Sequence, residues 1–482
     1  MGRFSDLLGF YLKRQDAKVA DLAEHCGINR SMMYKIVQGK RTLSDLALVE
    51  PIASFLRLSR KEKESLKEAY MMDEDGEFVI KRRNMIHDML CCDPVQNQAG
   101  FARASIQIQF TEDQPDVMPL QSENQINQMV FNVLLAEASK ENARICVYST
   151  VLSPSRTDSI SYVLSSCPDV RFDHIIGFSK SRSDAEAEEH NLTSFSSIIR
   201  FCTQSRNYNA WAAYSASAGN TDLTSGFSTF FLTSSHVILL SNDLSEGILF
   251  HKQDMVNLYA DMWKRLAAQA VPVVRRYTSV PDIIEYLSAY TLPQGTEITR
   301  LEPFPCLFGQ IDAQLIQEAA NPEIPGIDQM LATIVPYLAA YQEKMNTAGS
   351  AVHNIHCVRG FRTFAETGIL PELPPVFYRP FSHSQKVRLL NNYLNRMDQM
   401  DLLFMKEERT DLPDTFCLSL MENTVSLQFT DTDSPLVLSF KEPGIYLDFK
   451  DYIDFLTKDP SLFLSKEEVK GYLNDLIHHM EK

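Results

Sequence analysis

The sequence predicts a multidomain protein in which an all-α N-terminal domain precedes an α/β body. The chain has 482 residues, and domains typically contain about 100–200 residues, so roughly two to four domains are expected. Apolar side chains in residues 6–70 recur at helical spacing, with breaks at Gly27 and Gly39. From about residue 126 onward, helical and strand-like segments alternate, which is typical of an α/β domain.

The composition is that of a soluble globular protein. Hydrophobic residues make up 44% of the chain and charged residues 22%, and no apolar run reaches the roughly 18–20 residues that span a bilayer. The chain begins without an apolar signal segment. Nine scattered cysteines include no C-x-x-C pair, which indicates free thiols in a reducing compartment. We therefore expect a cytoplasmic protein that contacts no membrane.

Charge is distributed unevenly along the chain. Residues 1–67 contain 13 Lys and Arg against 8 Asp and Glu, a net charge of +5. The whole chain carries −16, which leaves −21 for the remainder. Nucleic acid attracts basic surfaces, so any contact with it is expected in the N-terminal segment.

The pattern divides the chain into four parts. Residues 1–70 form the helical domain, and residues 71–125 form a connector in which Pro, Gln and Asn are frequent towards its end. Two α/β lobes are predicted over residues 126–275 and 276–482. The first lobe begins with a helix, a strand, a second helix and a second strand, predicted over 126–140, 143–149, 158–166 and 170–178.

A faint internal repeat links the two predicted lobes. Strands within 227–240 precede a helix over 254–266, and strands within 416–429 precede a helix over 451–456. The likeness is one of apolar pattern more than of identity. Two related lobes and a chance similarity of β-hairpins both remain open.

A helix-turn-helix is predicted near the N-terminus. The apolar residues of its first helix share one face, because they fall at positions i, i+3, i+4 and i+7: Val19, Leu22, Ala23 and Cys26. Gly27 follows directly and can adopt the left-handed backbone conformation that a sharp turn needs. Asn29 can then cap a second helix whose inward residues are Met33 and Ile36. The residues left facing outward can donate to base edges: Arg30, Ser31, Tyr34 and Lys35.

Residues 19–41 resemble the helix-turn-helix of the Cro/repressor-like (XRE) family, and the likeness extends over residues 5–67. It includes the Leu-Ala pair of the first helix, the turn glycine and the Gln-Gly-Lys-Arg that ends the second. The resemblance implies that the second helix enters the major groove of double-stranded DNA and that the chain forms homodimers. It implies base contacts by Arg30, Ser31 and Lys35, with Tyr34 beside them, and phosphate contacts by Asn29, Gln38, Lys40 and Arg41.

The body faintly resembles the phospholipase D-like fold, which serves as a sensor region in some bacterial regulators. Activity in that superfamily depends on an H-x-K-x4-D motif in each half, in which the histidine is the nucleophile and the lysine holds phosphate. None of the eleven histidines here is followed two places later by lysine, and His251-Lys252 has the wrong spacing. We therefore expect a body without catalytic residues or a cofactor, so that the chain is not an enzyme.

One cluster of metal-ligand types stands out in the sequence. His353, His356 and Cys357 could place ligands on one helical turn, but no second Cys or His pair lies nearby. Ordinary polar or half-buried residues are the simpler interpretation, and no metal site is predicted. The sequence also lacks the phosphate-loop, dinucleotide-binding, nucleophile-elbow and H-E-x-x-H motifs.

These features together predict a sequence-specific, DNA-binding transcription regulator. Its acidic body would dimerise, sense a small-molecule or peptide effector, or do both. One alternative is a peptide-responsive regulator with a body of helical repeats, although no repeat period near about 34 residues is present. The other is an enzyme tethered to DNA, such as a nuclease or phosphodiesterase. A metal or phosphate ligand in the body would favour that second alternative.

Overall fold

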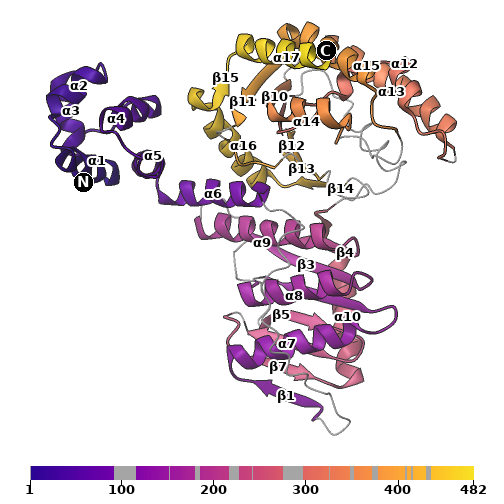
Figure 1. Ribbon diagram of the computed structural model, residues 1–482. Coiled ribbons are helices and arrows are strands. Elements are labelled where there is room, and N and C mark those ends of the chain that lie inside the picture. The colour runs from indigo at the N-terminus through magenta and orange to yellow at the C-terminus, as the bar shows by residue number, and fades with distance from the viewer. Residues whose placement is uncertain are drawn as a thin grey trace.

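A computed structural model of the protein describes residues 2–91, 115–150, 152–179, 185–215, 227–241, 243–274, 297–324, 326–347, 352–371, 378–407, 410–413, 416–429 and 436–481. These residues form a helical N-terminal unit and a body that contains two mixed sheets (Figure 1). The predicted multidomain organisation with an α/β body is confirmed. No helix among these residues combines the length and the apolar character needed to cross a membrane.

The N-terminal unit is built from α1 (Arg3–Arg14), α2 (Val19–His25), α3 (Arg30–Val37), α4 (Val49–Phe55) and α5 (Arg60–Glu74). They share one apolar core, which includes Leu8, Leu22, Met33, Ile36, Ile52 and Leu66. Gly27, between α2 and α3, has a φ of 64°, a left-handed conformation that costs a glycine little. The predicted short helices and the turn at Gly27 are confirmed.

Helix α6 (Glu77–Cys91) joins the N-terminal unit to the body (Figure 1). It packs against α9 (Ala185–Gln204) of the first lobe and α16 (Pro443–Thr457) of the second. The Arg83 guanidinium on α6 donates to both carboxylate oxygens of Asp451 on α16, at 2.9 and 3.0 Å, and to Asp75 at 2.6 Å. The start of the predicted connector is thus a docked helix, and residues 92–114 lie outside the described residues.

The first sheet contains β1 (Val117–Leu120), β2 (Arg144–Ser149), β3 (Arg171–Ser179), β4 (Tyr208–Ser215), β5 (Phe227–Leu232), β6 (Val237–Ser241), β7 (Gly247–Phe250) and β8 (Val271–Pro272). Its strand order is β1-β7-β6-β5-β2-β3-β4-β8. Strands β2, β3 and β4 are parallel, and the other pairings are antiparallel. The predicted helices and strands of this lobe are confirmed within a few residues.

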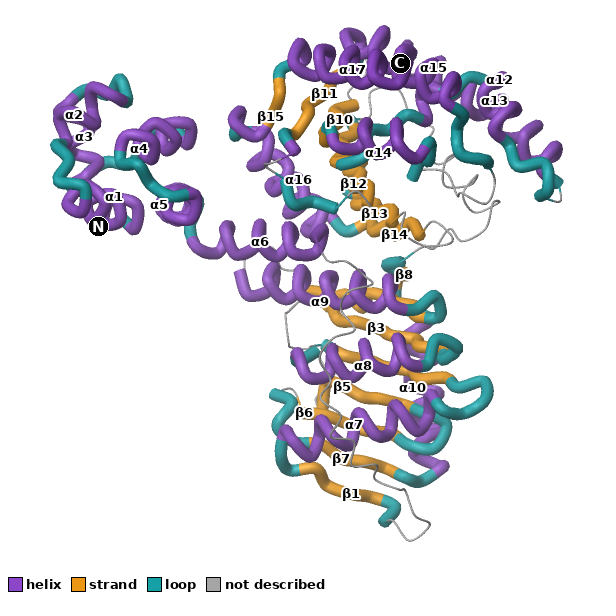
Figure 2. Tube along the Cα trace, viewed as in Figure 1, coloured by secondary structure: helices purple, strands orange, loops and turns teal. Residues whose placement is uncertain are grey.

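Helices cover both faces of the first sheet (Figure 2). One face packs against α7 (Glu123–Ala138), α8 (Pro154–Ser166) and α9, and the other packs against α10 (Gln253–Ala267). The side chains of successive strand residues point to opposite faces, so each strand contributes to both cores.

The second sheet contains β9 (Ile298–Glu302), β10 (Val352–Cys357), β11 (Asp401–Met405), β12 (Phe416–Met421), β13 (Thr424–Phe429), β14 (Leu436–Lys441) and β15 (Phe463–Leu464). The helices of this lobe are α12 (Ala313–Ala319), α13 (Ile327–Thr347), α14 (Arg359–Thr367), α15 (His383–Arg396), α16 and α17 (Lys466–Glu481). Strands β9, β10 and β11 are parallel, and the order is β14-β13-β12-β9-β10-β11-β15.

The two sheets repeat one topology. Apart from the additional β1, each has three parallel strands, an antiparallel three-strand meander on one side and a short antiparallel strand on the other. Helix α10 follows the meander of the first lobe, as α16 follows that of the second. The predicted correspondence between residues 227–240 and 416–429 is therefore confirmed at the level of topology. A body of helical repeats, the first alternative considered above, is wrong because the body is built on sheets.

The lobes share one apolar core. The Phe195 ring on α9 lies edge-on to Phe440 of β14, with ring centroids 4.3 Å apart, and 5.8 Å from Phe449 of α16. All three side chains are at most 2% exposed. Burial of such rings removes a large apolar area from water, which ties the lobes together.

A histidine lies fully buried in the first lobe. The His174 ring on β3 is 0% exposed, and its two nitrogens lie 2.8 Å from Ser149 Oγ and 2.9 Å from Tyr208 Oη. Burial disfavours the charged imidazolium and lowers the pKa of His174 to about 3. His174 is therefore a neutral, hydrogen-bonded core residue.

Candidate functional site

The residues predicted to read bases lie on the outer side of α3. The side chain of Asn29 caps this helix by accepting from the backbone N–H of Ser31 at 2.9 Å. Met33 and Ile36 face the core and are at most 1% exposed. The outward residues are all exposed: Arg30, Ser31, Tyr34 and Lys35.

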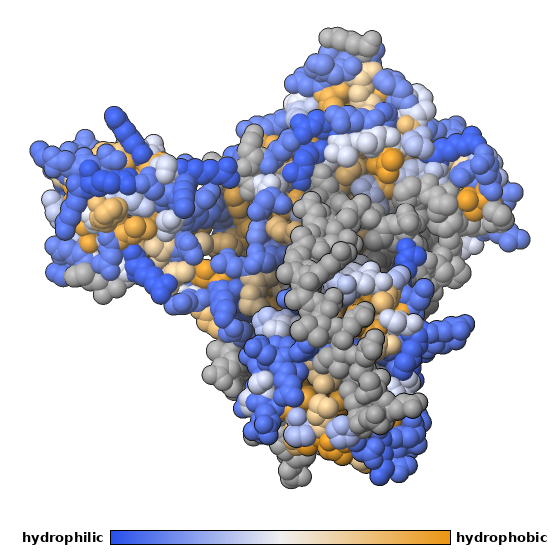
Figure 3. Space-filling model, turned by 60° about the horizontal axis from the view of Figure 1, so that its bottom comes forward, coloured by the Kyte–Doolittle hydropathy of each residue, from blue (hydrophilic) through white to orange (hydrophobic). Residues whose placement is uncertain are grey.

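The predicted phosphate contacts are exposed as well. Gln38, Lys40 and Arg41 follow the end of α3, where Gly39 has a φ of 66°. Hydrophilic side chains cover much of this unit, at the left of Figure 3. The Arg30 guanidinium lies 3.4 Å from the Glu24 carboxylate, and both side chains are exposed, so water screens that ion pair. The structure thus keeps all eight predicted side chains accessible.

Neither lobe contains both the histidine and the lysine of the phospholipase D motif. In the first lobe His236 lies directly before β6, and Asp243 follows His236 by seven residues, as the motif requires. The lysine position, however, is occupied by Ile238, which is 0% exposed. Strand register in the second lobe places Asn423 and Val425 at the corresponding positions. The sequence therefore lacks the paired histidines and lysines that bind phosphate in that superfamily.

His236 itself is enclosed by polar neighbours. Its ring stacks on His251 with centroids 4.5 Å apart, and its Nδ1 lies 2.9 Å from Ser235 Oγ. Burial, the His251 ring and the Lys140 ammonium lower the pKa of His236 to about 4. The spacing of His236 and Asp243 was a signal in the sequence, but a search for histidine and lysine two residues apart does not find it.

The H-x-x-H-C cluster lies on a strand, not on a helical turn. On β10 the side chains of His353 and His356 point to opposite faces, because they are an odd number of residues apart. His353 Nδ1 pairs with the Asp401 carboxylate at 2.5 Å, whereas His356 is buried and its Nδ1 bonds the Glu302 carbonyl at 3.1 Å. Burial lowers the pKa of His356 below its ordinary value. These residues do not converge on one point.

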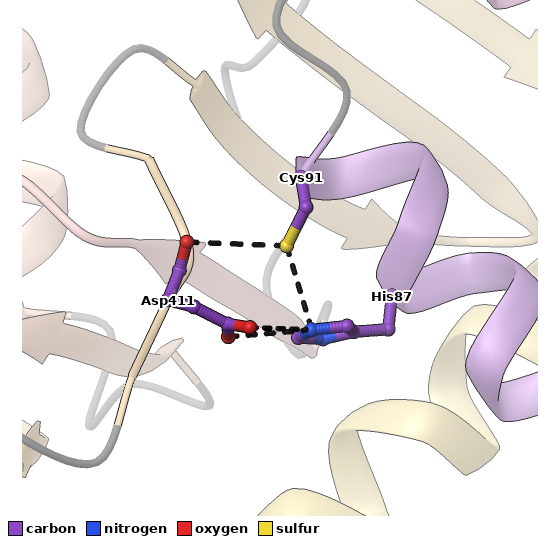
Figure 4. Close-up of side chains that lie close together, drawn as sticks. All are labelled: His87, Cys91 and Asp411. Atoms are coloured by element: carbon purple, nitrogen blue, oxygen red, sulfur yellow. Dashed lines mark hydrogen bonds and ion pairs between the residues drawn. The ribbon is translucent and has the colours of Figure 1, made fainter.

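The structure does bring together a set of metal-ligand side chains that the sequence did not link (Figure 4). His87 and Cys91 project from the last turns of α6, and Asp411 comes from the loop before β12. Cys91 Sγ lies 3.4 Å from His87 Nε2, and both carboxylate oxygens of Asp411 lie 3.3 Å from the same nitrogen. One ligand atom from each of the three lies within 4.8 Å of the others.

Neighbouring groups hold this cluster in place. His87 Nδ1 lies 2.8 Å from the hydroxyl of Tyr452, a residue of α16 that is 3% exposed. The Arg359 guanidinium donates to the carbonyl of Leu412 at 2.8 Å and so fixes the loop that carries Asp411. Burial, followed by the nearby Cys91 and Asp411, raises the pKa of Tyr452, which keeps the phenol protonated.

Solvent reaches the cluster. The Asp411 side chain is 76% exposed and that of His87 is 33% exposed. An imidazole nitrogen, a thiol and a carboxylate are the ligand types that zinc binds. The i,i+4 spacing of His87 and Cys91 on one helical face was a signal in the sequence. Asp411 lies 324 residues further on, and no local pattern could supply it.

Comparisons with known proteins identify no family for this chain. No protein-family model matches this sequence, and no curated protein does. The resemblance of residues 5–67 to the Cro/repressor-like family therefore stays a prediction.

Two of the solved structures that match are enzymes. A phosphatidylserine synthase of Haemophilus influenzae Rd KW20 is 10% identical with a TM-score of 0.22, over 76% of this chain and 93% of its own. A polyphosphate kinase of Porphyromonas gingivalis is also 10% identical with a TM-score of 0.22, over 75% of this chain and 55% of its own.

These matches correct two predictions made from the sequence. The main interpretation as a transcription regulator, and the expectation that the chain is not an enzyme, are not borne out by these matches, which are both enzymes. The alternative of an enzyme tethered to DNA agrees better with them. A likeness of this degree identifies no residue, so the chemistry has to be argued from the side chains themselves.

Proposed function

We propose that this chain is a DNA-tethered enzyme that hydrolyses phosphodiesters with a divalent metal ion held by His87, Cys91 and Asp411. The observation that carries the proposal is the convergence of three unlike ligand atoms within 4.8 Å at a solvent-accessible position. Catalytic zinc sites commonly use three protein ligands and leave a fourth position for water. The cluster supplies three such ligands.

The distances suit a small tetrahedral ion. Zinc bonds of about 2.0–2.3 Å place neighbouring ligand atoms roughly 3.5 Å apart. His87 Nε2 already lies 3.4 Å from Cys91 Sγ and 3.3 Å from the Asp411 carboxylate. The remaining adjustment falls on Asp411, whose side chain is 76% exposed. Metal binding requires Cys91 to lose its proton and become a thiolate.

The chemistry that such an ion would supply is a bound water whose pKa is lowered from that of bulk water to about 7. In phosphodiester hydrolysis the oxygen of one water forms a bond to phosphorus and the bond from phosphorus to the leaving oxygen breaks. The leaving oxygen takes up a proton, so the products are one phosphomonoester and one alcohol. The chain's own contribution is to hold the ligands rigidly from α6 and the Asp411 loop.

The N-terminal unit is the proposed tether, a helix-turn-helix of the Cro/repressor type whose second helix is α3. Support comes from the exposure of all eight predicted contact residues and from the net charge of +5 on residues 1–67. Arg30 and Lys35 suit guanine edges in the major groove, whereas Lys40 beyond the helix end suits a phosphate. Helix α6 carries both the tether and two of the three proposed ligands.

Hydrolysis of bis(4-nitrophenyl) phosphate by the full chain tests the enzyme proposal. Turnover is expected with added zinc or cobalt, and none after treatment with a chelator. His87→Ala and Asp411→Asn should reduce turnover to that of the metal-free protein. His353→Ala is the matched control, because His353 is also a partly exposed histidine paired with an aspartate. Equal turnover by His87→Ala and the unaltered chain would overturn the assignment.

Binding titrations on DNA test the tether separately. Arg30→Ala and Lys35→Ala should each weaken specific binding by about 1–3 kcal/mol. Lys40→Ala should weaken binding to all DNA sequences alike and lower the slope of log affinity against log salt concentration by about one. Lys61→Ala, an exposed lysine on α5, is the charge-matched control. An unchanged ratio of specific to random affinity in Arg30→Ala would show that α3 does not read bases.

Three further points belong to the proposal. The chain divides into units 1–70, 71–125, 126–275 and 276–482. It works in the cytoplasm, which suits eight described cysteines that are all free thiols. A homodimer and a small-molecule or peptide effector stay predictions.

A further inference from the structure

We infer that Tyr452 is a positioning residue of the proposed metal centre. Its hydroxyl lets the proton of the His87 ring sit on Nε2 without metal and on Nδ1 when a metal is bound. The inference rests on the proposed function, because it concerns the same three ligands. It stands on one contact, the 2.8 Å separation of His87 Nδ1 and Tyr452 Oη, and on the placement of Asp411 at the other ring nitrogen.

The contacts of the metal-free cluster favour one tautomer of His87. Nε2 lies 3.3 Å from both oxygens of the Asp411 carboxylate, which is only an acceptor, and 3.4 Å from Cys91 Sγ, a weak donor and acceptor. A proton on Nε2 satisfies the carboxylate. Nδ1 then has a lone pair and accepts a hydrogen bond from the Tyr452 hydroxyl. A metal ion reverses this assignment, because it binds to the lone pair of Nε2 and leaves the proton on Nδ1.

A tyrosine hydroxyl serves both states. It donates to Nδ1 in the metal-free cluster and accepts from Nδ1–H when a metal occupies Nε2, since a phenol can do either. Metal-bound histidines generally donate their second N–H to an acceptor such as a carboxylate, a backbone carbonyl or water, and loss of that partner weakens metal binding by about 10–100-fold. Tyr452 is well placed for this, because it is 3% exposed and fixed on α16.

The rest of the surrounding structure keeps the pair in register. Arg82 and Arg83 of α6, about one turn before His87, form ion pairs with α16. Their partners there are Asp448, about one turn before Tyr452, and Asp451, which directly precedes it. The His87 and Tyr452 rings lie 6.2 Å apart, centroid to centroid. The hydroxyl is therefore held at Nδ1 independently of any ion.

Cobalt titration of the full chain tests the inference, with the thiolate-to-cobalt absorption as the signal. Tyr452→Phe should bind cobalt about 10–100-fold more weakly than the unaltered chain. Tyr446→Phe, which removes a hydroxyl from the same helix, should bind cobalt normally. Equal cobalt affinity in Tyr452→Phe and Tyr446→Phe would overturn the inference.

A second measurement uses the unaltered chain, so it does not depend on whether a variant folds. Nitrogen chemical shifts of isotope-labelled histidine report which ring nitrogen is protonated. We expect His87 to carry its proton on Nε2 without metal and on Nδ1 with zinc. A proton on Nδ1 in both states would overturn the inference and leave the metal site standing. Cobalt binding without any phosphodiester turnover would instead contradict the proposed function and leave the inference standing.

Discussion

Acidification should destabilise this protein through His174, the buried histidine of β3. The ring is 0% exposed and both nitrogens have hydrogen-bond partners, Ser149 and Tyr208. Its folded-state pKa is about 3, whereas an unfolded histidine has a pKa of about 6.5. Because the folded-state pKa is lowered, the unfolded chain binds the extra proton. The stabilising effect of neutral His174 is therefore complete above pH 6.5 and is lost as the pH falls towards 3.

The size of the effect follows from the two pKa values. At pH 5 an unfolded histidine is almost fully protonated, while folded His174 is still neutral. Each pH step of one unit below 6.5 then costs about 1.4 kcal/mol. Between pH 7 and pH 5 His174 should account for a loss of about 2 kcal/mol in the free energy of unfolding.

Urea unfolding at pH 7 and pH 5, on the unaltered chain and on His174→Gln, measures this contribution. Glutamine retains a polar group for Ser149 or Tyr208 but does not titrate. The pH dependence of His174→Gln should be weaker by about 2 kcal/mol, whatever its stability at pH 7. All other titrating groups, His236 included, cancel in the difference. The same pH dependence in both proteins would refute the reasoning.

Two further predictions concern the contacts that hold the units together. Arg83→Ala should destabilise the protein by about 3 kcal/mol, which is the lower end of the range for a broken buried ion pair, because the Asp451 side chain is one-third exposed. Arg83→Lys should restore only part of this stability, and thermal unfolding measures both variants. Phe195→Ala should cost about 3–5 kcal/mol, since the ring packs 4.3 Å from Phe440 between the lobes, and Phe195→Leu should cost less. Equal unfolding temperatures for Phe195→Ala and the unaltered chain would contradict a shared core.

Local signals in the sequence accounted for much of the fold. The apolar spacing of the N-terminal helices, the glycine turn at Gly27 and the cap at Asn29 each act over a few residues, so each was predictable. Two strands of each meander were predicted from their apolar runs, within residues 227–240 and 416–429. Their arrangement in two sheets of equal topology depends on pairings between distant strands, such as β12 with β9, which no local pattern encodes.

The candidate site was harder to predict because it joins distant parts of the chain. His87 and Cys91 are four residues apart and shared a helical face in the sequence, but Asp411 and Tyr452 reach them only through the docking of α6 on the second lobe. The opposite error occurred at His353 and His356. They are close in sequence, but a strand separates them, because alternate residues face opposite sides.

The central claim is that one divalent metal ion binds at His87, Cys91 and Asp411. X-ray absorption on the zinc-loaded full chain tests it most directly. We predict four ligands, one sulfur at about 2.3 Å and three nitrogen or oxygen atoms at about 2.0–2.2 Å, one of them water. Cys91→Ser should remove the sulfur contribution, whereas Cys417→Ser should not. A zinc shell without sulfur, or one unchanged in Cys91→Ser, would contradict the account.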